Sequence, residues 1–186
     1  MELGLVEIYT GNGKGKTTAA VGLAVRASGW GLKVAIVHFM KVGGYGESRI
    51  LKRQSNITEK FYGMNYFITT NKSITHPSVV LYEAGKPPAE YVAKVMRGLK
   101  WAYRALLSGR FDIIVLDELL TAVNMGLIEE NDVLKMIRER PYNVELIITG
   151  RYATQAMIDE ADLVTEMRKI KHPYDRGVQA RKGIEF

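Results

Sequence analysis

A glycine-rich stretch near the start of the chain constrains the possible folds more than any other feature of the sequence. Its residues are Thr10-Gly11-Asn12-Gly13-Lys14-Gly15-Lys16-Thr17-Thr18. The apolar run at residues 3–9 comes directly before it, and a helix is predicted at residues 18–28. A strand, a glycine-rich turn that ends in Gly-Lys-Thr, and a helix are the parts of a phosphate-binding loop. The sequence therefore predicts a nucleotide site at this turn.

The residue types in this loop suit the binding of phosphate and of a metal ion. Glycines let backbone N–H groups converge on phosphate oxygens without a Cβ clash, and the following helix points its partly positive N-terminus at the same anion. We expect Lys16 to add a charge to the phosphates and Thr17 to offer its hydroxyl to Mg²⁺ or Mn²⁺. The common pattern has glycine where this chain has Thr10, so Gly11 and Gly13 would do that work in a different register. The alternative is an ordinary glycine-rich turn, which the strand-loop-helix context disfavours.

Composition limits the class of protein and the chemistry open to it. The chain has 186 residues, with 47% hydrophobic and 25% charged residues, which is typical of one globular domain over residues 1–186. It has no cysteine, so disulfides, thiolate metal sites and cysteine nucleophiles are excluded. We find no apolar run long enough to cross a membrane and no signal peptide, and we expect a cytoplasmic protein. The net charge of +6 suits a polyanionic ligand and equally suits nucleic acid.

The rest of the chain alternates between short β-branched runs and helical patterns. Strands are predicted at residues 34–39, 57–61, 111–116, 144–149 and 163–167, in addition to the run at 3–9. Helices are predicted at residues 88–107, 129–138 and 154–160, and a loop at 71–88. This alternation indicates an α/β fold in which helices flank a mostly parallel sheet. We expect three α/β/α layers with the RecA-like architecture of P-loop NTPases.

Two carboxylates follow one of the predicted strands directly and form a second chemical motif. The motif is Ile113-Ile114-Val115-Leu116-Asp117-Glu118, which has the form of a Walker B signature. The carboxyl end of a strand opens onto the crevice where open α/β sheets bind ligands. Asp117 and Glu118 could there reach a Mg²⁺ ion held by Thr17, directly or through water. The alternative is a strand that ends in a solvated acidic turn.

Two further segments carry charge that phosphate could use. Thr149-Gly150-Arg151 follows another predicted strand, and the planar fork of Arg151 suits bidentate contact with phosphate unless it is simply a solvated surface arginine. The tail at residues 169–186 is basic with aromatic residues interspersed. Its composition is equally typical of a disordered tail and of a nucleic-acid contact.

Taken together, these blocks resemble the ATP:corrinoid adenosyltransferases of the P-loop type. The resemblance is carried by Thr10 to Ala20, by Val115-Leu116-Asp117-Glu118-Leu119, by Ile147-Ile148-Thr149-Gly150-Arg151, and by a tail that runs from Lys171-His172 through Asp175 and Gly177-Val178 to Gly183-Ile184. The phosphate loop alone is shared by many unrelated NTPases, whereas this form of the loop together with this tail is much more specific.

The resemblance implies a particular reaction. A corrinoid such as cobalamin or cobinamide is reduced to Co(I), which attacks the 5′ carbon of ATP, so that a cobalt–carbon bond forms and tripolyphosphate leaves. The family is thought to hold ATP reversed in the loop relative to P-loop hydrolases. The resemblance also implies an electron-donating reductase such as a flavoprotein, a homodimer, and no membrane or nucleic-acid partner.

The resemblance implies roles for individual residues as well. The catalytic residues would be Lys16, Glu118 and Arg151. The nucleotide would be held by Thr10, Gly11, Asn12, Gly13, Lys14, Gly15, Lys16, Thr17, Thr18 and Arg151. Thr17 and Glu118 would bind the metal ion, and Asp117 would either bind it too or support a group that does. The tail at residues 171–186 would fold over or near the active site.

Two departures from the family concern the corrinoid half of the site. Relatives carry a Gly-Phe-Thr-Trp motif where this chain has the tryptophan-free stretch Gly63-Met64-Asn65-Tyr66-Phe67-Ile68-Thr69-Thr70. Tyr66 or Phe67 could substitute for that motif or could be ordinary core aromatics. Many relatives also have an N-terminal extension over the site, and we expect that cover to come from elsewhere here, for example from a partner subunit. We expect none of His38, His76 and His172 to bind cobalt.

Three other functions remain open from the sequence alone. One is a P-loop ATPase or kinase that acts on the γ-phosphate with Glu118 as the base. Another is a basic, RecA-like nucleic-acid-binding ATPase that uses its tail on phosphates. The third is a regulatory protein that keeps the nucleotide site without corrinoid chemistry.

Overall fold

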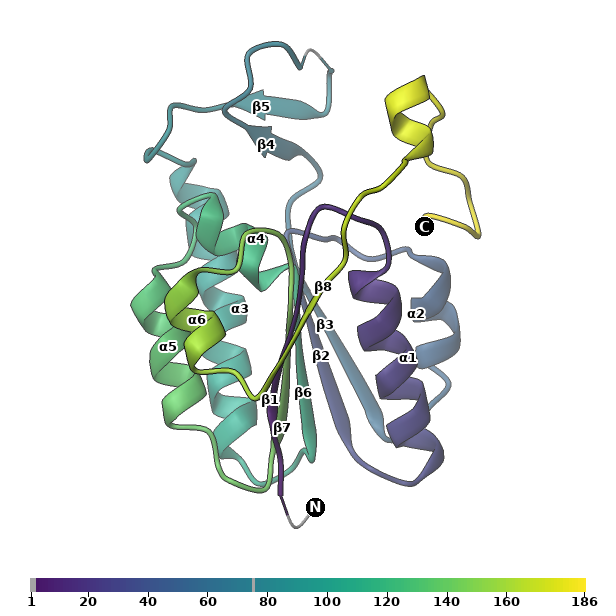
Figure 1. Ribbon diagram of the computed structural model, residues 1–186, viewed down its shortest axis with the longest axis vertical. Coiled ribbons are helices and arrows are strands. Elements are labelled where there is room, and N and C mark those ends of the chain that lie inside the picture. Colours follow the sequence, from purple (N-terminus) through teal and green to yellow (C-terminus); the bar gives the residue numbers. More distant parts are fainter. Residues whose placement is uncertain (1–2, 75) are drawn as a thin grey trace.

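Six parallel strands form the main sheet in the computed structural model, which describes residues 3–74 and 76–186 (Figure 1). The strands are β1 (Val6–Thr10), β2 (Val34–Phe39), β3 (Ile57–Tyr62), β6 (Ile113–Asp117), β7 (Glu145–Thr149) and β8 (Leu163–Glu166). Their order across the sheet is β3-β2-β6-β7-β1-β8, and every pairing is parallel. The predicted α/β class is therefore confirmed, with all six strands of this sheet parallel.

Helices cover both faces of this sheet and produce the three predicted layers (Figure 1). On one face lie α1 (Lys16–Gly29) and α2 (Gly46–Leu51). On the other face lie α3 (Ala89–Leu107), α4 (Leu119–Asn124), α5 (Glu130–Arg138) and α6 (Gln155–Asp159). Because helices shield both faces, every residue of β2 and of β6 is buried, as expected for central strands of a parallel sheet.

The phosphate-loop helix packs on the sheet through small side chains. Ala20, Ala24 and Ala27 of α1 are buried against Val34, Ile36 and their neighbours in one apolar cluster. Alanine side chains let a helix axis approach the sheet closely, so this contact fixes the N-terminus of α1 relative to the ends of the strands. The larger core cluster lies on the other face, where α3 buries Val95, Leu99, Ala102 and Leu106. Val92 of the same helix is half-buried.

Five short elements differ from the prediction. The segment predicted as a loop at residues 71–88 contains β5 (Val79–Leu81), which pairs in parallel with β4 (Phe67–Thr69) in a separate two-stranded sheet. The helices α2 and α4 have six residues each, which is too short for a helical period to show in the sequence. The tail contains a 3₁₀ turn, η1 (Pro173–Arg176).

The ends of some predictions fall on residues that the structure does not describe. Residues 1 and 2 of the predicted domain and residue 75 of the predicted loop lie outside the described ranges. Within residues 3–74 and 76–186, no helix combines the length and the apolar character needed to cross a membrane.

Candidate nucleotide site

The phosphate loop joins the end of β1 to the start of α1. Gly11 and Gly15 adopt φ angles of 102° and 119°, in the region that favours glycine. A Cβ at Gly13 would lie 2.6 Å from the carbonyl oxygen of Met167, and the Gly13 N–H donates to that same oxygen. Only glycine therefore fits at Gly13, where the loop passes against the segment that follows β8.

Lys16 closes this loop from within and gives it a buried positive charge. Its Nζ donates to the carbonyl oxygens of Gly11 and Gly13, both at 2.8 Å. Burial lowers the pKa of Lys16, although the carboxylates of Glu118 and Asp117 oppose that shift. The ammonium group of Lys16 is thus held at the loop by hydrogen bonds to uncharged carbonyl oxygens. A phosphate oxygen can replace these carbonyl oxygens as its partner.

A cavity of about 230 Å³ lies over the loop. Its lining brings together most of the predicted site residues with part of the tail: Asn12, Gly13, Lys14, Gly15, Lys16, Thr17, Thr18, Glu118, Arg151, His172, Ile184 and Glu185. Thr10 and Gly11 are absent from this lining, and the Thr10 hydroxyl accepts a hydrogen bond from the Ala153 N–H at 3.2 Å. Thr10 therefore supports the loop from beneath.

Asp117 is absent from this lining and is saturated with hydrogen bonds. Its Oδ1 accepts from the hydroxyls of Thr17 and Thr149, both at 2.8 Å. Its Oδ2 accepts from Lys41 Nζ at 2.7 Å and faces His38 Nδ1 at 2.8 Å. Burial alone would raise the pKa of Asp117, but the hydrogen bond from His38 and the charge of Lys41 hold it well below its usual range. The carboxylate is therefore ionised, with all of its acceptor positions in use.

Glu118 is the carboxylate that faces the cavity itself. It follows β6 directly and adopts a φ of 62°, which is uncommon for a residue with a side chain. Its Oε2 accepts from the Thr121 hydroxyl at 2.6 Å. Together with the Thr17 hydroxyl and Asp117, it gives the hard oxygen ligands that Mg²⁺ or Mn²⁺ prefers. Since Asp117 is saturated, Glu118 is the carboxylate with free acceptor capacity.

Backbone strain gathers at the same edge of the sheet. Among the described residues, the non-glycine residues with positive φ are Met40, Glu118 and Tyr152, and they follow β2, β6 and β7. Such conformations cost free energy and persist where the surrounding structure imposes them, often at functional sites. The carboxyl edge of the sheet is thus marked by strain as well as by charge.

Arg151 stands between the phosphate cavity and a larger one. This second cavity has a volume of about 610 Å³ and is lined by Ile68, Thr69, Thr70, Tyr82, Ala84, Gly85, Thr121, Val123, Asn124, Met125, Gly126, Arg151 and Tyr152. Tyr66 and Phe67, the predicted substitutes for the family's aromatic motif, are not in this lining. The Tyr66 hydroxyl donates to Glu90, and Phe67 is exposed.

The C-terminal tail reaches the other side of the loop. Lys14 Nζ donates to the carbonyl oxygen of Ile184 at 3.0 Å and to Glu185 Oε1 at 3.1 Å. Hydrogen bonds from Arg181 and then from Lys14 lower the pKa of Glu185 to about 2. A third cavity, of about 450 Å³, is lined by Thr17, Thr18, Val21, Lys41, Tyr45, Gly46, Glu47, Gly183, Ile184, Glu185 and Phe186. The acidic side chain of Glu185 thus forms an ion pair with Lys14, a cation of the phosphate loop.

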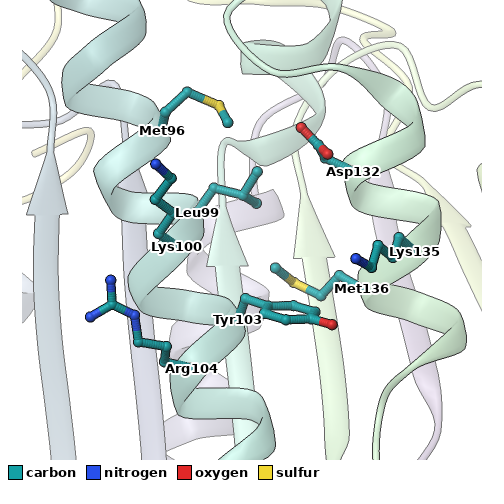
Figure 2. Close-up of a pocket in the computed structure, with 8 residues that line it drawn as sticks. All are labelled: Met96, Leu99, Lys100, Tyr103, Arg104, Asp132, Lys135 and Met136. Atoms are coloured by element: carbon teal, nitrogen blue, oxygen red, sulfur yellow. The ribbon is translucent and has the colours of Figure 1, made fainter.

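A separate hollow between α3 and α5 has different chemistry (Figure 2). It has a volume of about 270 Å³, and its lining combines the buried Leu99 and Met136 with Lys100, Arg104 and Lys135. None of the predicted site residues lines it. It contains no residue of the phosphate loop.

The sequence reasoning gave no role at the nucleotide site to His38 or to Lys41. His38 sits inside an apolar strand, and a titratable residue in a fully buried strand is itself a signal that a partner is near. Lys41 follows β2 shortly after its carboxyl end, where the neighbouring strand β6 carries Asp117. The position of both beside Asp117 depends on strand order, which the sequence alone did not give.

Comparison with known proteins points to one family. Residues 2–186 match the family model of the ATP:corrinoid adenosyltransferases BtuR/CobO/CobP. The corrinoid adenosyltransferase of Pseudomonas aeruginosa is 33% identical over 187 residues, covering 100% of this chain and 85% of that protein. That of Escherichia coli K12 is also 33% identical over 187 residues, covering 100% of this chain and 87% of that protein.

Among solved structures, the cytoplasmic domain of the Thermomonospora curvata type VII secretion ATPase EccC matches with a TM-score of 0.45 and 14% identity. The match covers 94% of this chain but only 21% of that larger one.

Proposed function

The chain belongs to the ATP:corrinoid adenosyltransferase family, and from that premise we propose how its site transfers the 5′-deoxyadenosyl group of ATP to a reduced corrinoid. In this reaction the electron pair of Co(I) attacks C5′ and becomes the cobalt–carbon bond. The bond from C5′ to the phosphate oxygen breaks, and tripolyphosphate leaves with the electron pair of that broken bond. The enzyme thereby serves adenosylcobalamin synthesis or salvage. No general base is needed, because cobalt itself is the nucleophile.

The leaving triphosphate sets the main demand on the protein, which is to stabilise negative charge. We propose that Lys16, Arg151 and the backbone of residues 12–18 bind it. The supporting observation is that these groups and Glu118 line one cavity at the N-terminus of α1. Preorganised cations and dipoles aimed at developing charge supply the largest part of many enzymes' rate enhancement.

A divalent metal would fit beside this triphosphate. We propose that the Thr17 hydroxyl and Glu118 would hold Mg²⁺ or Mn²⁺, and that Asp117 would orient the Thr17 hydroxyl, to which it is bonded at 2.8 Å. When bound, the ion would neutralise charge on the leaving oxygens. Glu118 is itself fixed for this purpose by the hydrogen bond from Thr121 and by its place at the end of β6.

The second cavity is the best candidate for the corrinoid. It meets the phosphate cavity at Arg151, which lines both, and so lies beside the position of a reacting sugar carbon. We propose that Tyr82 and Tyr152, which line it, contact the corrinoid ring. This assignment gives the aromatic role that was predicted for Tyr66 or Phe67 to two residues that line the same cavity as Arg151.

The remaining partners are proposed on chemical grounds. Co(I) requires an electron donor, and we propose a reductase such as a flavoprotein. We also propose a homodimer, whose second subunit could cover the site. Since ATP is consumed, we place the reaction in the cytoplasm, where ATP is made.

The product of ATP identifies the reaction. We propose to incubate the protein with ATP, Mg²⁺ and chemically reduced corrinoid and to analyse the phosphate product. Tripolyphosphate together with a light-sensitive corrinoid is expected, whereas ADP and phosphate formed without corrinoid would indicate a γ-phosphate ATPase or kinase.

Lys16→Ala and Glu118→Ala should each abolish transfer while the circular dichroism spectrum is kept, and full activity in either would refute this ATP site. A steep, salt-dependent affinity for DNA or RNA would favour the nucleic-acid alternative.

A further inference from the structure

His38 is a buried ring held between two carboxylates. Its Nδ1 lies 2.8 Å from Asp117 Oδ2 and its Nε2 lies 3.1 Å from Glu59 Oε1. The ring stacks on Phe61, with centroids 4.6 Å apart and planes inclined by 8°. The pairing of β2 with β3 on one side and β6 on the other places His38 directly beside Phe61 and Asp117. Both the rotamer and the position of the ring are therefore fixed.

Each ring nitrogen of His38 faces a carboxylate oxygen, and carboxylate oxygens accept hydrogen bonds. Burial alone would lower the pKa of His38, but the hydrogen bonds with Asp117 and Glu59 raise it. The Ser48 hydroxyl also donates to Glu59 Oε1 at 3.1 Å, but within the described part of the chain Glu59 Oε2 has no hydrogen-bond partner. Glu59 thus contacts both His38 and Ser48 through the same oxygen, Oε1.

Stability alone is a weak reason for such an arrangement. A buried ion pair must offset the loss of hydration of each charge, and a well-packed apolar pair of similar volume is often as stable. What the arrangement does provide is a fixed direction for the carboxylate of Asp117. Oriented partners behind a metal site commonly change metal affinity about 10- to 100-fold when they are removed.

The four partners of Asp117 differ in their freedom to move. Thr149 and His38 are buried, at 0% and 1% exposure, and belong to strands of the sheet. Thr17 and Lys41 line a cavity, and Lys41 Nζ also lies 3.1 Å from the Thr17 hydroxyl. Any rearrangement around a bound metal would therefore involve Thr17 and Lys41, while His38 and Thr149 stay in place.

We propose that His38, locked by Glu59, is a positioning residue that holds the Asp117 carboxylate so that Thr17 and Glu118 can bind the divalent metal. This inference rests on the metal site of the proposed function. His38 is buried and lines none of the three cavities around the phosphate loop and Arg151, so it acts on the site only through Asp117.

Metal binding tests this role independently of turnover. His38→Gln keeps a donor for only one of the two carboxylates. Electron paramagnetic resonance of Mn²⁺ with ATP should show about 10-fold weaker metal binding in this variant. The Mg²⁺ concentration that gives half-maximal transfer should rise by the same factor of about 10. At saturating metal the KM for ATP should stay within about two-fold of wild type. His76→Gln, at an exposed histidine, is the matched control and should change neither quantity.

A double variant separates positioning from folding. His38→Leu with Glu59→Leu removes both charges together, so no unpaired charge stays buried. We expect this variant to fold and still to bind Mn²⁺ weakly. Wild-type Mn²⁺ affinity in either His38 variant would overturn the inference. If the wild type makes no adenosylated corrinoid, the proposed function fails, yet the Mn²⁺ measurements still decide the role of His38.

Discussion

Lys41 is a single side chain that serves both the buried acid and the open cavity. Its Nζ lies 2.7 Å from Asp117 Oδ2 and 5.3 Å from the centre of the Tyr45 ring, while its side chain lines the cavity beside Thr17. Burial opposes its charge, but the carboxylate of Asp117 raises the pKa of Lys41. It therefore carries its positive charge in the lining of a cavity beside the phosphate loop.

Replacing Lys41 should reduce transfer strongly. Lys41→Met keeps most of the side-chain volume and removes the charge, so the leaving triphosphate loses one stabilising cation. We expect kcat/KM for ATP to fall by about 10²-fold, the usual order for one such group. Steady-state kinetics of tripolyphosphate release measure this. Lys100→Met, on the outer face of α3, should leave kcat/KM unchanged, and an equal loss there would count against the role of Lys41.

At the scale of elements, the phosphate loop depends on a strand distant in sequence. β8 pairs with β1 from Glu7 to Thr10, and the chain then continues past the loop, where Met167 accepts from the Gly13 N–H. The Lys169 N–H donates to Asn12 Oδ1 at 2.9 Å in the same stretch. The loop is thus held by the segment after β8 as well as by its own helix.

Gly13→Ala should therefore damage the loop. The added Cβ would lie 2.6 Å from the Met167 carbonyl oxygen and 2.9 Å from the Arg168 backbone, neither of which is a flexible side chain. We expect a loss of about 1–3 kcal/mol in the free energy of unfolding, as for other overpacked sites. ATP binding should weaken as well. Urea unfolding and calorimetric titration with ATP measure the two effects, and unchanged values would contradict the close contact.

Gly22→Ala is the opposite case in the neighbouring helix. A Cβ at Gly22 would meet no atom within 4 Å, and the residue lies inside α1. Alanine restricts the unfolded chain and favours the helix by about 0.5–1 kcal/mol. We expect the melting temperature to rise by about 1–4 °C with activity unchanged. A lower melting temperature would mean that the outer face of α1 is packed in solution.

The sequence predicted these elements unevenly, for physical reasons. The strand-loop-helix unit and α3 were predictable, because glycine spacing and a 3.6-residue period are local signals. The helices α2 and α4 and the β4–β5 pair were not, since elements of three to six residues are stabilised by the contacts they make in the fold. For the site, local motifs indicated Lys16, Glu118 and Arg151. His38 and Lys41 became visible only once β2 was known to lie beside β6.

At the scale of the whole molecule, the C-terminal tail meets the phosphate loop that follows the first strand. Lys14 and Glu185 are separated by 171 positions in sequence and lie 3.1 Å apart. Arg181 Nη2 holds the same carboxylate at 3.0 Å, so the last turn of the tail presents Glu185 to the loop as a preformed anion. A triphosphate that binds Lys14 must compete with it.

Glu185→Gln should therefore lower the KM for ATP, because Lys14 no longer has an anionic partner that the triphosphate must displace. The change should be only about two- to five-fold, since exposed ion pairs are weak. The pKa of Glu185 is lowered to about 2, so the ion pair is complete above the ordinary glutamate pKa of about 4.3 and is lost only as pH falls through about 2. The ratio of KM values between wild type and variant should accordingly stay constant from about pH 5 to 8, and should shrink as salt rises.

Glu139→Gln, which removes a partner of Lys135 on α5, should leave the KM for ATP unchanged. A KM ratio that titrates between pH 5 and 8 would show that another group, and not Glu185, competes with ATP at Lys14.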